Sequence, residues 1–127
     1  MDRHVASRLK KELVIWLVTV SKDARPQAVP VWFLWDGKSF LIHSVDGAKV
    51  NHIKLNPNVE LHLNSDGAGD DVVRVSGTAT VSGSPAAHRS AAYMRKYGRS
   101  IRDLGLKPED FSGQYRNAIR VRRLRFH

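Results

Sequence analysis

Cysteine is absent from this chain of 127 residues, and its absence excludes several kinds of chemistry. Without a thiol there is no disulfide bond, no thiolate metal ligand and no cysteine nucleophile. The six histidines contain no pair in the HxxxH spacing, and no carboxylate cluster accompanies them. We therefore expect no metal site. A GxSxG sequence is also missing, so nothing indicates a serine nucleophile.

Long hydrophobic runs are missing as well. The longest, from Leu13 to Val18, is far too short for a membrane span or for the apolar region of a signal peptide. With 42% hydrophobic and 26% charged residues, the chain has the composition of an ordinary folded protein. We expect a cytoplasmic protein with no membrane partner.

Negative charge is scarce. Twelve Asp and Glu stand against 21 Lys and Arg, which leaves a net charge of +9. Such an excess favours an anionic partner, either a nucleic acid, an acidic membrane or a phosphorylated small molecule, although it could also serve only solubility. The basic segment Arg120–Arg125 would suit a polyanion, but its pattern favours a last strand with an exposed basic face, so nucleic acid is not the expected partner.

The hydrophobic pattern predicts a mainly β protein with a single domain over residues 1–127. Alternation and β-branched residues indicate six strands, at 13–20, 26–35, 39–43, 59–64, 73–81 and 115–126. Helical patterns are found at 1–12, 47–56 and 84–97, with one helical turn at 108–111 and an irregular segment at 98–107. Six strands joined by hairpin turns and short helices favour a closed antiparallel barrel.

Two details of this prediction depend on proline. The strand 26–35 is apolar on both faces and must be covered on both sides, by barrel closure together with a helix or a partner. Pro30 has no N–H to donate, so it requires an edge or a bulge within that strand. In the helix 84–97, Ser84 is expected at the N-cap and Pro85 at the first helical position.

One segment has the features of a phosphate site. Ser44 ends a strand, Gly47 lies in a turn, and Lys49 falls in the first turn of the following helix. A helix N-terminus offers unpaired N–H groups and partial positive charge, to which a hydroxyl and an ammonium group would add. The alternative is a serine in a turn beside a solvated lysine, and local physics leaves both open.

Three stretches, in order, resemble one known family. They are Trp16–Val20 with Arg25–Gly37, then Ile42–Ser44 with Ala48–Val59, and finally Ala92–Gly98. They are similar to the pyridoxamine 5′-phosphate oxidase-like split-barrel proteins, especially the branch of coenzyme F420-dependent enzymes. The resemblance implies a six-stranded antiparallel split β-barrel of the FMN-binding type. It also implies a homodimer, with a cofactor pocket at the interface that residues of the second subunit complete.

The resemblance further implies roles for individual residues. Lys49 and Ser44 would bind the cofactor phosphate with His43 beside them, as a neutral donor or a cation. The backbone of Pro30, Val31 and Trp32 would run along the ring. Polar contacts would come from Gln27 and Asn51. The expected cofactor-binding set is Lys49, Ser44, His43, Asn51, Gln27, Pro30, Val31, Trp32 and Ala48.

Ala48 marks a departure from the family. The oxidases carry an arginine immediately before the lysine, and the loss of that cation favours F420 over FMN and over pyridoxamine-phosphate oxidation. We therefore expect an F420-dependent oxidoreductase that moves hydride to or from an unidentified small molecule, with no catalytic residue assigned. The alternatives are an FMN-binding or haem-binding protein, a non-catalytic cofactor carrier, and a basic polyanion-binding barrel. Possible contacts to an acidic cofactor tail are Arg74, Arg116, Arg120 and Arg122.

Overall fold

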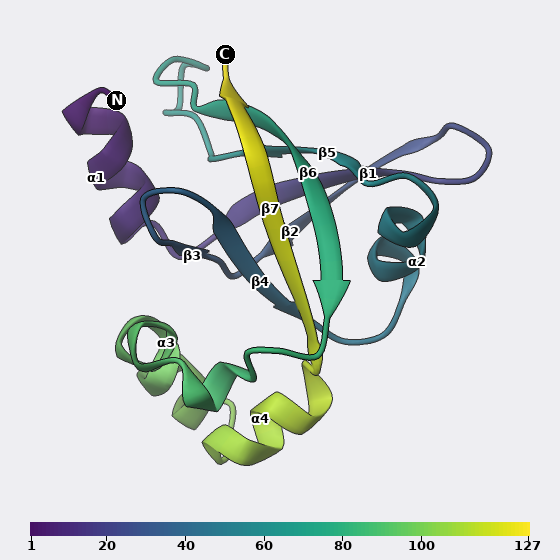
Figure 1. Cartoon of the computed structure of the whole chain (residues 1–127). Helices are drawn as coiled ribbons and strands as arrows, with labels where there is room; N and C mark the ends of the chain where they lie inside the picture. Colours follow the sequence, from purple (N-terminus) through teal and green to yellow (C-terminus); the bar gives the residue numbers. More distant parts are fainter.

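One antiparallel sheet of seven strands organises the protein (Figure 1), in a computed structural model that describes residues 1–127. The strands follow the order β2-β1-β5-β6-β7-β4-β3. Their bounds are β1 Ile15–Val20, β2 Pro26–Val31, β3 Leu34–Trp35, β4 Phe40–Ser44, β5 Asn58–His62, β6 Arg74–Ser82 and β7 Asn117–Phe126. The helices are α1 Arg3–Lys11, α2 Ala48–Leu55, α3 Ala91–Asp103 and α4 Pro108–Gln114, with a 3-10 turn η1 at Ala87–Arg89.

The main core lies inside the curl of the sheet. Along β1, buried residues alternate with half-buried ones, so Ile15 and Leu17 point into the core from every second position. Phe33, Phe40 and Ile42 meet them there. A smaller core, Ala87, Tyr93, Tyr97, Ile101 and Phe111, forms where η1, α3 and α4 gather at one end of the sheet, at the bottom of Figure 1.

The predicted strand 26–35 is wrong in one respect, because it is broken at Trp32 and Phe33 into β2 and β3. The backbone of Phe33 makes its hydrogen bonds to side chains of α3 instead of to a neighbouring strand. Its N–H donates to the Tyr97 hydroxyl at 2.9 Å, and its carbonyl accepts from Lys96 Nζ at 2.8 Å. This break raises the number of strands from the expected six to seven.

The same break explains how the sheet becomes a split barrel. β2 and β3 lie at opposite ends of the strand order, yet only Trp32 and Phe33 separate them in the chain. Three residue steps span at most about 11 Å, so the two edges must meet at this corner. The split-barrel prediction is confirmed, with the chain itself joining the edges there. Pro30 lies on an edge strand as expected, since β2 pairs only with β1.

The predicted helix 84–97 is also corrected. The chain is extended at Ala86, passes through η1, and enters α3 only after Ser90, whose hydroxyl accepts from the Tyr93 N–H at 3.2 Å. Ser90, rather than Ser84, is therefore the N-cap. The helix continues to Asp103 through part of the segment expected to be irregular, because Tyr93, Tyr97 and Ile101 repeat every four residues on its buried face. The expected turn at 108–111 extends to Gln114 as α4.

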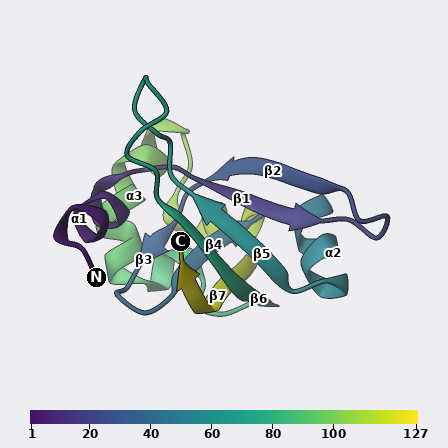
Figure 2. The same cartoon turned by 90° about the horizontal axis from the view of Figure 1, so that it is seen from above.

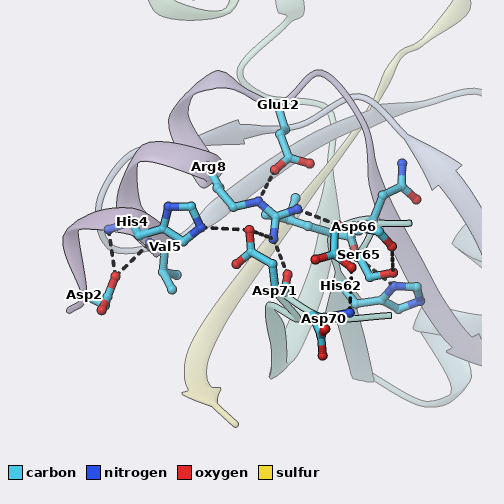
Figure 3. A network of polar contacts seen from close by, with 12 residues as sticks. Asp2, His4, Val5, Arg8, Glu12, His62, Ser65, Asp66, Asp70 and Asp71 are labelled. Atoms are coloured by element: carbon cyan, nitrogen blue, oxygen red, sulfur yellow. Dashed lines mark hydrogen bonds and ion pairs between the residues drawn. The ribbon is translucent and has the colours of Figure 1, made fainter. Parts of the chain in front are cut away.

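Helix α1 is held against the sheet by a polar network around Arg8 (Figure 3). The Arg8 guanidinium donates to the Glu12 carboxylate and to the backbone carbonyls of Asp71 and Asn64. His4 Nε2 lies 2.8 Å from the Asp71 carboxylate. Leu9 on the same helix is fully buried in the core. No helix of the structure combines the length and apolar character needed to cross a membrane.

A β-bulge bends the ribbon formed by β6 and β7, which Figure 2 shows from above. Ser76 lies opposite Arg125 while Thr78 lies opposite Arg122, so Gly77 faces one extra residue on β7. A Cβ at Gly77 would stand 2.7 Å from Val121 Cγ1 and 2.9 Å from the Arg122 carbonyl oxygen. Glycine is therefore required for the two strands to approach this closely.

Candidate functional site

A cavity of ≈ 270 Å³ opens between the sheet and the helices α2, α3 and α4. It lies at the end of β2 and beside β4, near the corner where the two sheet edges meet. Both the sheet and the helical layer contribute to its wall, so residues far apart in sequence meet there. The lining residues are Pro30, Val31, Trp32, His43, Lys49, Tyr93, Leu104, Phe111 and Tyr115.

Lys49 is the cation of the cavity. It is the second residue of α2, it is half-buried, and its ammonium group takes part in none of the ion pairs or hydrogen bonds of the structure. Burial alone lowers the pKa of Lys49. A positive charge that has lost part of its water and has no counter-ion is stabilised by an anion from outside the chain. The cavity therefore offers an anion-binding position at Lys49.

His43 contributes an uncharged ring. It lies on β4 opposite Ala118, and its residue exposure is 6%. Burial, with a smaller contribution from the positive charge of Arg120, lowers the pKa of His43 to about 4. The imidazole is thus neutral at physiological pH, which decides between the two states considered from the sequence. Its Nε2 is enclosed and has no hydrogen-bond partner.

Tyr93 is a cavity residue that sequence reasoning did not single out. It lies in the first turn of α3, is fully buried, and meets His43 edge to face with ring centroids 4.7 Å apart. Its hydroxyl also has no partner. Burial, together with the nearby hydroxyls of Tyr97 and Tyr115, raises the pKa of Tyr93. The resemblance of Ala92–Gly98 to a family helix was the available signal, but it assigned no role to this residue.

Stacked aromatic rings form one wall. Trp32 lies parallel to Tyr97 at 4.8 Å and nearly parallel to Phe111 at 5.8 Å, while Phe111 stacks on Tyr115 at 4.4 Å. Such a stack is rigid because each ring is held by the next. Leu104, Phe111 and Tyr115 were likewise missed from the sequence, since only the fold of α3 and α4 brings them beside β2.

The remaining expected cofactor residues lie outside the cavity wall. Ser44 is buried on β4, and its hydroxyl donates to the Val45 carbonyl at 2.7 Å. Asn51 faces a second, polar depression that Lys54 and Arg116 also line. Gln27 is exposed on β2, and Ala48 is exposed at the start of α2. The structure thus brings together Lys49, His43, Pro30, Val31 and Trp32, but not these four.

Several arginines considered for an acidic tail already have partners. Arg116 pairs with Asp46 at 2.5 Å, Arg74 with Glu60 at 3.1 Å, and Arg120 with Asp36 at 3.5 Å. Arg122 is exposed on β7. The cation that lines the cavity and lacks an acidic partner is Lys49.

These residues fit an elongated ligand with one anionic end and a planar neutral body. The unpaired ammonium group of Lys49 suits the anion, and the aromatic stack suits a flat ring. No group of three or more side chains that could hold a metal ion is found.

The chain is similar to a known protein family and to several solved structures. The sequence model of the family described as pyridoxamine 5′-phosphate oxidase matches residues 1–126. A solved structure described as an F420 reductase is 25% identical and has a TM-score of 0.77, over 100% of this chain and 98% of that one. The conserved hypothetical protein Rv2991 from Mycobacterium tuberculosis is 19% identical, with a TM-score of 0.72 over 99% and 84% of the two chains.

A third similar structure is the haem storage protein HutZ from Vibrio cholerae. It is 14% identical with a TM-score of 0.61, over 98% of this chain and 92% of that one. No curated protein sequence matches the chain. The two structures below 25% identity establish likeness of fold only.

Proposed function

We propose, because this chain belongs to the pyridoxamine 5′-phosphate oxidase family, that its cavity binds a flavin-type cofactor with the phosphate at Lys49. The preferred cofactor is the deazaflavin F420, and the protein is an oxidoreductase that transfers hydride between it and a small molecule. The observation that carries this proposal is the half-buried, unpaired cation at the end of an aromatic cavity. The similarity to an F420 reductase supports the choice of cofactor.

The absence of a second cation beside Lys49 also supports F420. Ala48 is exposed at the start of α2 and has no charge to offer. A phosphate monoester such as that of FMN carries up to two negative charges, whereas the phosphodiester of F420 carries one. One ammonium group matches the phosphodiester more closely. FMN remains the second candidate, because Lys49 would also attract its phosphate.

The chain's own residues would bind and shield the cofactor. When bound, F420 supplies the hydride chemistry. Lys49 would hold the phosphate, and the β2 segment from Pro30 to Trp32 would lie along the ring. Helix α4 would exclude water from one side through Phe111 and its C-cap residue Tyr115. The substrate stays unassigned.

A second copy of the chain would close the other side. β2 is an edge strand, and its residues Ala28 and Pro30 are exposed although they are apolar. Pro30 also lines the cavity. An exposed apolar edge is normally covered, and covering it here would complete the cofactor pocket. A homodimer with the cofactor at its interface is therefore part of the proposal.

Titration with F420 and with FMN, followed by fluorescence, tests the function. We expect wild-type protein to bind F420 more tightly than FMN. Lys49→Ala should weaken F420 about 10- to 100-fold, the value of a charge-assisted hydrogen bond. Lys54→Ala is the matched control, since Lys54 lies on the same helix but faces the second depression. Binding of neither cofactor, or equal effects of the two lysine variants, would contradict the proposal.

Turnover distinguishes an enzyme from a carrier. Reduced F420 should be oxidised in the presence of protein and a suitable acceptor from a panel of quinones, enones and tetrapyrroles. Tight binding of F420 without oxidation by any acceptor would favour the non-catalytic carrier.

A further inference from the structure

Lys49 brings the one side-chain amine to the wall of the aromatic cavity, and no carboxylate lines the cavity beside it. Its side chain is half-buried and makes no hydrogen bond. The enclosed polar atoms without a partner are His43 Nε2 and the Tyr93 hydroxyl, so Lys49 Nζ is not enclosed and solvent reaches it. A small molecule that enters the cavity can therefore touch the amine.

The surroundings of Lys49 disfavour its charged form. Burial lowers the pKa of Lys49, and no neighbouring acid raises it again. At a given pH such a lysine presents more neutral amine than a fully solvated one. The neutral amine is a nucleophile, and lysines in apolar pockets are activated in this way. The cost of the half-buried charge is thus relieved either by an anion or by a reaction that consumes the neutral amine.

The other walls restrict the shape of a molecule that reacts there. Trp32 lies nearly parallel to Phe111 with ring centroids 5.8 Å apart, and Phe111 lies nearly parallel to Tyr115 at 4.4 Å. Flat, rigid faces of this kind favour an aromatic ring over a saturated one of the same size. Apolar walls also exclude water, which favours a condensation that releases water to the solvent.

We propose that the cavity, when no cofactor fills it, binds an aromatic aldehyde with which Lys49 forms a reversible imine. The lone pair of Lys49 Nζ adds to the aldehyde carbon, and the carbonyl π electrons move to the oxygen. That oxygen then leaves as water with the two protons of the neutral amine while the C=N bond forms, so nothing is oxidised or reduced. This activity goes beyond cofactor binding. Because both ligands need Lys49, each excludes the other.

Reductive trapping with cyanoborohydride, followed by peptide mapping, tests the activity. Benzaldehyde is the aromatic probe, and cyclohexanecarbaldehyde is the saturated probe with the same number of carbon atoms. Lys54 is the reference within each sample, because it is exposed on the same helix and faces the second depression. Benzaldehyde should label Lys49 about tenfold faster than Lys54, since the walls hold the ring beside Nζ. Equal labelling of the two lysines by benzaldehyde would overturn the proposal.

The saturated probe separates recognition of an aromatic ring from simple reactivity of the amine. With cyclohexanecarbaldehyde the ratio of Lys49 to Lys54 labelling should be about three- to tenfold lower than with benzaldehyde. The same ratio with both probes would show a reactive lysine without an aromatic site, and would overturn the proposal.

Lys49→Arg is the matched variant, because it keeps the positive charge but has no nucleophilic amine. The preferred benzaldehyde label should vanish from this protein, while labelling of Lys54 stays unchanged. A benzaldehyde label of undiminished total amount in Lys49→Arg would place the reaction at another lysine and contradict the assignment.

F420 distinguishes this activity from the proposed cofactor function. If F420 fills the cavity, it should protect Lys49 from benzaldehyde. Preferred labelling of Lys49 in a protein that binds no F420 would support the imine and refute the cofactor proposal. Labelling of Lys49 that saturating F420 leaves unchanged would show that the two ligands do not share the cavity, and would overturn the exclusion proposed here.

Discussion

The Tyr97 hydroxyl accepts a hydrogen bond from the backbone N–H of Phe33 across 2.9 Å, at the corner where the two edges of the sheet meet. The same hydroxyl can donate a hydrogen bond to the carbonyl of Leu13 at 2.8 Å or to that of Phe33 at 3.0 Å. Lys96 donates to the same Phe33 carbonyl. One turn of α3 therefore closes the barrel corner and also holds Trp32, the ring stacked on Tyr97, in the cavity wall.

Loss of this hydroxyl should destabilise the protein. Tyr97→Phe leaves the Phe33 N–H buried without a partner, and we expect the free energy of unfolding to fall by about 1–3 kcal/mol. Urea denaturation measures the change. Tyr115→Phe is the control, because Tyr115 shares the aromatic stack but is only half-buried and should lose little. Equal stability of wild type and Tyr97→Phe would show that the corner is held in another way.

The neutral state of His43 predicts a pH dependence. Its pKa is about 4 in the folded protein, below the ordinary value of 6.5, so between these pH values the unfolded chain binds a proton that the folded protein does not. Stability should therefore fall as the pH decreases from 6.5 to 4, by at most about 3 kcal/mol. Urea denaturation at several pH values should show that His43→Phe lacks this loss.

The carboxylates do not obscure that measurement. The pKa values of Asp36, Asp46 and Asp71 are lowered from 3.8, so the stability they contribute is lost mainly below pH 4. A decrease between pH 6.5 and 4 that persists in His43→Phe would assign the effect to another group.

Arg8 should act through the shape of its guanidinium as well as its charge. It is largely buried and binds a carboxylate and two backbone carbonyls (Figure 3). Arg8→Ala should cost about 2 kcal/mol and expose α1 to proteolysis. Arg8→Lys should recover only part of this stability, because an ammonium group cannot reproduce the fork of donors. Full recovery by lysine would mean that charge alone holds α1.

Gly77 should not tolerate a side chain. Alanine there would bring its Cβ against Val121 and the backbone of Arg122, and β6 and β7 must then separate. We expect Gly77→Ala to lower the free energy of unfolding by about 1–3 kcal/mol. Gly83→Ala is the control, since nothing lies within 4 Å of the position its Cβ would take. Thermal unfolding should show a lower midpoint for Gly77→Ala and an unchanged midpoint for Gly83→Ala; equal midpoints would contradict the prediction.

The proposed dimer predicts a linked loss of assembly and cofactor. Ala28→Arg places a charge on the exposed edge strand β2, where two basic chains would meet. Sedimentation should show a monomer, and F420 should bind more weakly because one wall of the pocket is lost. Asn58→Arg, at an exposed position on β5, should change neither property. A dimeric Ala28→Arg with weakened F420 binding would argue against this interface.

Much of the fold was determined by the sequence alone. The β-branched and aromatic run at residues 15–20, the alternation at 74–82, the turn at Asp36–Gly37 and the short helix ended by Pro57 are local signals, and each element formed close to its expected bounds. The same is true of Pro30, which has no N–H and so required an edge strand. Such features depend on a few neighbouring residues, so they can be predicted without knowing the rest of the chain.

The break at Trp32–Phe33 and the composition of the cavity were decided only by the tertiary structure. Phe33 leaves the ladder because Tyr97 and Lys96, more than sixty positions later in the chain, bond its backbone. The Ser44 hydroxyl donates to the carbonyl of its own neighbour, whereas the Tyr93 ring packs against His43. The sequence determined that Lys49 is a cation at the start of a helix. Only the packing of α3 and α4 against the sheet determined which rings surround it, because contacts between distant segments leave no local pattern.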